Sequence, residues 1–109
     1  MAQLVPVAEL GKIRPGTTLS VAVADVEVAL FNVDGMVYAL DDCCVRCNAP
    51  LSKGSPNGTL VLCRGCGWEY ELSTGAVCAL PDLRVQTFDV TVVGAQLMLS
   101  VGESAADGH

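Results

Sequence analysis

Two cysteine pairs with identical spacing are the part of the sequence most able to do chemistry. Cys44 and Cys47 lie in the segment CVRC, and Cys63 and Cys66 lie in CRGC, so two residues separate the members of each pair. A C-x-x-C segment can form a tight knuckle in which both sulfurs turn to one side. Two facing knuckles place four thiolates at the corners of a tetrahedron, which suits zinc, a single iron or an iron–sulfur cluster. The spacing therefore predicts a metal site made by Cys44, Cys47, Cys63 and Cys66.

Three further residues near these pairs bear on the site. Gly67 follows Cys66 and suits a position with positive φ, where an N–H group could approach a sulfur. Cys43 adjoins Cys44, and neighbours in an extended chain point to opposite faces. We therefore expect Cys43 outside the site, although it could replace Cys44 as a ligand. Cys78 is expected to be a small buried apolar residue.

The remaining notable side chains near the pairs are interpreted as structural. Trp68 is expected to pack under the second knuckle. Glu69 and Glu71 share one face of their strand and should face solvent. The adjacent carboxylates Asp41 and Asp42 are expected in a solvated loop or local turn.

Composition limits the class of protein. The chain has 109 residues, a net charge of −6 and 51% hydrophobic residues, which fits one domain with its own core. The negative charge argues against nucleic-acid binding. No apolar run approaches the roughly 20 residues of a membrane helix, and the first residues lack the features of a secretory signal. We therefore expect a monomeric cytoplasmic protein with reduced thiols.

The few basic residues are unevenly placed. Of the six in the chain, Arg46, Lys53 and Arg64 lie in or beside the cysteine segments. They are either solvated loop residues or a locally positive rim. Such a rim could receive an acidic partner or offset thiolate charge.

The elements that must position the cysteines are predicted to be strands. Asp34-Gly35 and Gly94-Ala95 each separate two apolar runs and predict hairpins. Helix is scarce, with one turn expected at 6–11. Short strands at this spacing are typical of a small sandwich or barrel. The predicted strands occupy 18–26, 26–33, 59–63, 68–72, 83–93 and 96–101, with a frayed tail after them.

With these residues in view, nearly the whole chain resembles a Rieske-type ferredoxin domain of the kind found in ring-hydroxylating dioxygenase systems. VYALDDCC is similar to the strand entering the first cluster loop, APLSKG to the end of that loop, CRGCG to the second loop, and WEYELSTGAV to the strand and turn that follow. The resemblance implies an all-β Rieske-like domain over 1–101, with two metal-binding loops at one tip, a metal-binding subregion at about 41–77 and a flexible tail at 102–109.

The resemblance fails at the ligand histidines. The family pattern has C-x-H in the first loop and C-x-x-H in the second. Each loop supplies one cysteine to one iron of a [2Fe–2S] cluster and one histidine to the other iron. Here Arg46 stands at the first histidine position and Cys66 at the second, while the chain's one histidine is His109. Arginine has no lone pair to give a metal. We expect a single rubredoxin-like metal ion shared by the four cysteines, and an all-cysteine [2Fe–2S] cluster remains the alternative.

Two functions follow from this reasoning. The resemblance implies an electron carrier, not an enzyme, that passes single electrons from a flavin reductase to a terminal oxygenase. The alternative is a zinc module without redox chemistry that has a structural or partner-binding role. A catalytic role is disfavoured, because no histidine within the predicted fold could act as a general base.

Overall fold

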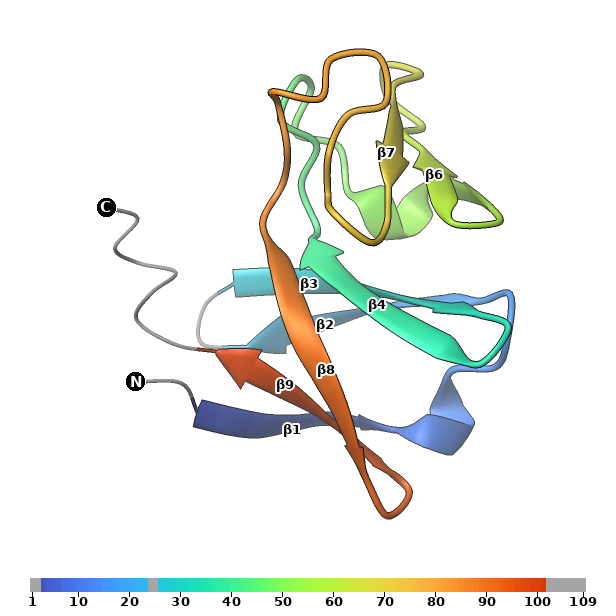
Figure 1. Ribbon diagram of the computed structural model, residues 1–109, viewed down its shortest axis with the longest axis vertical. Coiled ribbons are helices and arrows are strands. Elements are labelled where there is room, and N and C mark those ends of the chain that lie inside the picture. Colours follow the sequence, from blue (N-terminus) through green and yellow to red (C-terminus); the bar gives the residue numbers. More distant parts are fainter. Residues whose placement is uncertain (1–2, 24–25, 102–109) are drawn as a thin grey trace.

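The computed structural model describes residues 3–23 and 26–101, which form two antiparallel sheets (Figure 1). The larger sheet has six strands in the order β1-β9-β8-β4-β3-β2 and is barrel-like. The smaller sheet has the order β5-β6-β7 and lies beyond one end of the larger one, at the top of Figure 1. The strands are β1 (Gln3–Glu9), β2 (Thr18–Val23), β3 (Val26–Val33), β4 (Met36–Asp41), β5 (Ser55–Asn57), β6 (Leu60–Leu62), β7 (Glu69–Glu71), β8 (Thr87–Val93) and β9 (Gln96–Val101), with 3-10 turns at Leu10–Lys12 and Leu51–Lys53.

The all-β prediction is confirmed, and the two predicted hairpins connect β3 to β4 and β8 to β9. In the first turn Asp34 has φ 54° and Gly35 has φ 96°. Positive φ at both central residues twists the turn in the sense that the flanking strands require. No helix among the residues that the structure describes is long and apolar enough to cross a membrane.

Strand β3 lies between two hydrophobic cores, and residues 28–31 of this strand are therefore all apolar. Val28 and Leu30 point into the core of the large sheet, whereas Ala29 and Phe31 point toward the small sheet. All four side chains are buried, because alternate residues of a strand face opposite sides and here both sides are covered.

The predicted helical turn at 6–11 is wrong. Residues Gln3–Glu9 form β1, which pairs with β9, and the single turn of 3-10 helix comes later, at Leu10–Lys12. The register shifts between Pro6 and Ala8, as expected for a residue without an N–H to give the ladder. Pairing with residues 87 to 98 positions away overrode a weak local signal.

Other differences concern element boundaries. The predicted strand 83–93 begins only at Thr87, and the connection between the cysteine pairs contains a 3-10 turn and β5. The predicted tail at 102–109 lies outside the described residues.

Candidate metal centre

The structure brings the four predicted cysteines together at the tip of the two loops. Their sulfur atoms all lie within 4.8 Å of one another. The closest approaches run between the loops: Cys44 Sγ lies 3.8 Å from Cys66 Sγ, and Cys47 Sγ lies 3.5 Å from Cys63 Sγ. Each knuckle therefore gives one sulfur to each of two cross-loop pairs.

The first knuckle is held by two backbone hydrogen bonds. The Cys44 N–H donates to the Ala49 carbonyl at 2.9 Å, and the Asn48 N–H donates to the Cys44 carbonyl at 3.0 Å. Asn48 has φ 65°, in the left-handed region, where asparagine is among the few tolerated residues other than glycine. The sequence contains this signal in Asn48, but it went unrecognised beside the more familiar glycine of the second loop.

The second knuckle repeats the same geometry. The Cys63 N–H donates to the Trp68 carbonyl at 2.7 Å, and the Gly67 N–H donates to the Cys63 carbonyl at 2.9 Å. Gly67 has φ 83°, as predicted, but its N–H binds a carbonyl and not a sulfur. In the first knuckle the Arg46 N–H does reach a sulfur, 3.4 Å from Cys44 Sγ.

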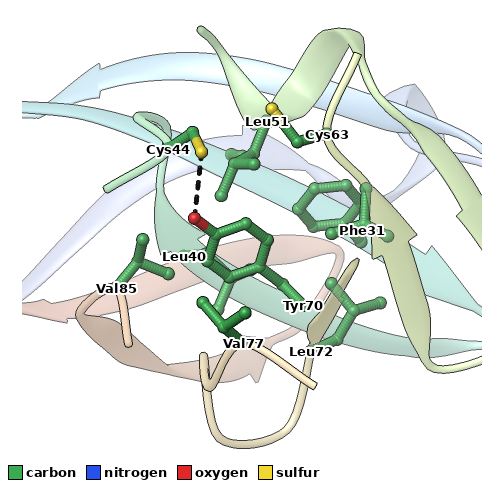
Figure 2. Packing of buried hydrophobic residues seen from close by; sticks show 11 residues of the cluster. Phe31, Leu40, Cys44, Leu51, Cys63, Tyr70, Leu72, Val77 and Val85 are labelled. Atoms are coloured by element: carbon green, nitrogen blue, oxygen red, sulfur yellow. Dashed lines mark hydrogen bonds between the residues drawn. The ribbon is translucent and has the colours of Figure 1, made fainter. Parts of the chain in front are cut away.

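A buried tyrosine supports the first loop from below. Tyr70 comes from β7, and Figure 2 shows its hydroxyl pointing at Cys44 among Leu51, Val77 and Val85. Its oxygen lies 3.0 Å from Cys44 Sγ and accepts the Val45 N–H at 3.1 Å. Since the oxygen already accepts, the single hydroxyl proton is free for the sulfur. Tyr70 was not among the predicted site residues, because its contact with Cys44 depends on the fold.

The thiols of Cys44 and Cys47 differ in acidity in the metal-free protein. Burial would raise the pKa of Cys44, but hydrogen bonds from Tyr70 and from the N–H groups of Cys47 and Arg46 outweigh it and lower that pKa to about 6. The Ala49 N–H favours the Cys47 thiolate, yet burial and the neighbouring thiols raise the pKa of Cys47 to about 12. A metal that binds all four as thiolates must displace protons from the more basic members.

Arg46, at the family's histidine position, does not point into the cluster. Its guanidinium lies 5.0 Å from the centroid of the Trp68 ring, a cation–π contact between the two loops. Trp68 is half-buried and packs against the core cluster that contains the cysteines. The predicted packing of Trp68 near the second knuckle thus agrees with the structure. Arg64 and Lys53 are exposed.

Asp41 and Asp42 were expected in a solvated loop or local turn, but Asp41 ends β4 and Asp42 is buried. Its side chain is 5% exposed and accepts three hydrogen bonds. The donors are the Ser52 N–H at 2.7 Å, the Ser52 hydroxyl at 2.7 Å and the Ser20 hydroxyl at 2.8 Å. A buried carboxylate is tolerated when its lone pairs are used in this way. The arrangement fastens the first loop to β2, and nothing local to Asp42 in the sequence indicates it.

The other predictions near the site have mixed outcomes. Cys78 is exposed, not buried, because it lies on the irregular segment after β7. Cys43 is half-buried and outside the four-sulfur cluster, with its sulfur 3.5 Å from Asn48 Oδ1. Glu69 faces solvent, whereas Glu71 is half-buried.

Comparison with known proteins places the chain in a family. The family model of the Rieske [2Fe-2S] domain matches residues 3–102. The chain therefore belongs to the Rieske domain family, and the predicted resemblance is confirmed.

The relatives narrow this class to ferredoxin components. The ferredoxin component of the naphthalene 1,2-dioxygenase system of Pseudomonas aeruginosa is 31% identical to this chain over 93 residues. The aligned part covers 84% of this chain and 89% of that protein. The ferredoxin component of the p-cumate 2,3-dioxygenase system of Pseudomonas putida is 35% identical to this chain over 77 residues. The aligned part covers 69% of this chain and 65% of that protein. The solved ferredoxin of carbazole 1,9a-dioxygenase from Nocardioides aromaticivorans IC177 has a TM-score of 0.83 at 29% identity, covering 89% of this chain and 96% of the other. Such homologues are electron carriers rather than catalysts, as was expected here.

The [2Fe–2S] cluster with two histidine ligands that is typical of the Rieske family does not fit the four cysteines of this site. A cluster with two histidine ligands needs imidazole nitrogens at the loop tip. The four atoms gathered there are all sulfurs, and the first histidine position holds an arginine stacked on Trp68. The scaffold is that of a Rieske ferredoxin, and the donor set is not.

Proposed function

We propose that this protein is a small electron carrier in which one metal ion, held by Cys44, Cys47, Cys63 and Cys66, replaces the cluster of its relatives. The observation that carries the proposal is the mutual closeness of the four sulfurs, all within 4.8 Å. A tetrahedral site with metal–sulfur bonds of about 2.3 Å has edges of about 3.8 Å. The two cross-loop contacts, at 3.8 and 3.5 Å, approach that edge length.

The same distances disfavour an all-cysteine [2Fe–2S] cluster. Such a cluster divides its four thiolates between two irons, so thiolates on different irons are held apart by the width of the iron–sulfide core. No pair of sulfurs here is separated in that way.

Iron is favoured over zinc by kinship, because geometry alone suits both metals. The relatives are ferredoxin components of dioxygenase systems, and a carrier of single electrons needs a metal that changes oxidation state. Bound iron would supply that one-electron chemistry. The chain's own residues would fix four thiolates, stabilise one of them through Tyr70, and limit access of water through buried Leu51. By the same kinship, the partners are proposed to be a flavin reductase and a terminal oxygenase.

Metal analysis tests this proposal. The protein is purified from cells supplied with both iron and zinc, and iron, zinc and acid-labile sulfide are measured per chain. One iron without sulfide, together with a reversible one-electron couple, is expected. Two irons with two sulfides would establish the cluster instead, and zinc without iron would favour a structural module.

The ligand chemistry adds an independent check. Thiolate ligands carry no proton that titrates near neutral pH once they are bound to metal, unlike ligand imidazoles. The midpoint potential is therefore expected to vary little between pH 6 and 9. A steep dependence would contradict ligation by four thiolates.

A further inference from the structure

The two knuckles contact each other through equivalent positions. The residue two positions after the first cysteine of one knuckle contacts the residue five positions after the first cysteine of the other knuckle. This relation holds in both directions. In one direction this pair is Arg46 and Trp68, 5.0 Å from guanidinium to ring centroid. In the other direction it is Gly65 and Ala49, where a Cβ built on Gly65 would lie 3.0 Å from the Ala49 Cβ.

The side chains of these two pairs differ greatly in size. The side chains therefore shield the two sides of the sulfur cluster to different extents. The bulky pair closes the side next to Cys66, which is half-buried and packs with Trp68 against the core. The small pair stands next to Cys47, which is exposed. A Cβ on Gly65 would lie only 2.8 Å from Cys47 Sγ, so glycine is what allows the sulfur to occupy this place.

The two inner cysteines are closed to solvent from every direction. Cys44 is 0% and Cys63 is 1% exposed, and both belong to the core cluster beneath the loops. Of the four sulfurs, only that of Cys47 therefore belongs to an exposed residue and also lies on a side lined by small neighbours.

We propose that electrons enter and leave the site through the Cys47 thiolate, on the open side formed by Gly65 and Ala49. This inference rests on the proposed function. The reductase or the oxygenase proposed above presents its own one-electron redox group to this side. One electron moves, the site is oxidised by one unit, the acceptor is reduced by one unit, and no covalent bond forms or breaks. The Arg46–Trp68 pair is the bulkier wall, next to half-buried Cys66.

Filling the open side tests the proposal. Ala49→Val and Ala49→Leu place added carbon atoms next to Cys47 without touching a charge. In the reduced iron protein, the rate of oxidation by hexaammineruthenium(III), followed by stopped flow, is expected to fall severalfold and further for Leu than for Val. The midpoint potential, measured in parallel, should change little. An unchanged rate in both variants that keep iron would overturn the proposal.

The matched change on the closed side is Trp68→Ala, which removes cover next to Cys66. If Cys47 is the route, this variant should be oxidised no faster than the wild type. A severalfold faster rate in Trp68→Ala would mean that Cys66 is the route and would also overturn the proposal. This arm remains decisive if the Ala49 variants do not fold.

A redox-free measurement separates this inference from the proposed function. The zinc-loaded protein is mixed with the chelator 4-(2-pyridylazo)resorcinol, which must also reach the cluster from its open side. Zinc release should be slower in Ala49→Leu than in wild type, and equal rates would count against an open side at Cys47. A protein that holds no iron but shows this slowing would contradict the electron carrier while supporting the open side.

Discussion

At the scale of single residues, the hydroxyl of Tyr70 is the most informative contact. It lies 3.0 Å from Cys44 Sγ in a buried position. A hydrogen bond to a metal-bound thiolate strengthens when the site gains an electron, because the sulfur then carries more negative charge. Tyr70 should therefore favour the reduced state.

Replacing this tyrosine tests its role. Tyr70→Phe should lower the midpoint potential. A hydrogen bond stronger in the reduced state by about 1 kcal/mol corresponds to roughly 40 mV for a one-electron couple. Tyr38→Phe is the matched control, since Tyr38 packs against the same core and its hydroxyl has no hydrogen bond among the described residues. Equal potentials in the two variants would exclude a contribution from the contact with Cys44.

Asn48 allows a second test at this scale. Because its φ is 65°, Asn48→Ala should destabilise the metal-loaded protein by about 1 kcal/mol, whereas Asn48→Gly should be tolerated. Urea unfolding of both variants measures the difference. If alanine and glycine were equally stable here, the left-handed position would have no energetic role in the knuckle.

At the scale of elements, Asp42 joins parts that are distant in the sequence. It follows β4, and its carboxylate accepts hydrogen bonds from Ser20 of β2 and from Ser52 of the 3-10 turn Leu51–Lys53. The Thr18 hydroxyl also donates to the Ser52 carbonyl at 2.9 Å. These bonds fix the first knuckle to the large sheet.

Asp42→Asn replaces one accepting oxygen by an NH2 group that faces donors. The free energy of unfolding should fall by about 1.5–3 kcal/mol, the range for hydrogen bonds to a charged group. Chemical denaturation at pH 7 with metal bound measures the loss. A change as small as that of an exposed substitution would mean that the network is not formed in solution.

Asp41 provides a control, because replacing this carboxylate is expected to change the free energy of unfolding in the opposite direction. Burial and then the charge of Asp42 raise the pKa of Asp41. Because the pKa is raised in the folded protein, ionised Asp41 lowers stability once the pH exceeds the pKa of Asp41 in the unfolded chain, about 3.9. Asp41→Asn should therefore be neutral or stabilising at pH 7, and this advantage should vanish as the pH falls below 4. A loss of stability at pH 7 would contradict the sign.

At the scale of the whole molecule, the two cores are expected to respond differently to loss of metal. The core of the large sheet contains Ile13, Leu30 and Leu97 and no cysteine, whereas the core under the small sheet includes buried Cys44 and Cys63. A metal that joins four thiolates contributes its binding energy to the folding of the segment that supplies them.

Removal of the metal with a chelator at pH 7 should therefore loosen the small sheet first. Hydrogen exchange should accelerate at the amides of β6 and β7, while β1 and β9 keep their protection. Uniform acceleration across both sheets would indicate a single cooperative unit instead of two.

The sequence alone was sufficient for the features that are set locally or by repetition. Doubled C-x-x-C spacing identified the four clustered cysteines, and Asp34-Gly35 with its flanking apolar runs identified a hairpin. Residue type at a fixed spacing determines such features, because a knuckle or a two-residue turn is decided by the dihedral angles of a few neighbours.

Only the tertiary structure decided which distant groups surround those cysteines. The contact of Tyr70 with Cys44, the burial of Asp42 and the pairing of residues 3–9 with β9 all join segments far apart in the chain. The close approach of Gly65 in one knuckle to Cys47 and Ala49 in the other likewise depends on how the two loops pack. Local pattern carries no information about such pairs, since they are chosen by the packing of the two sheets.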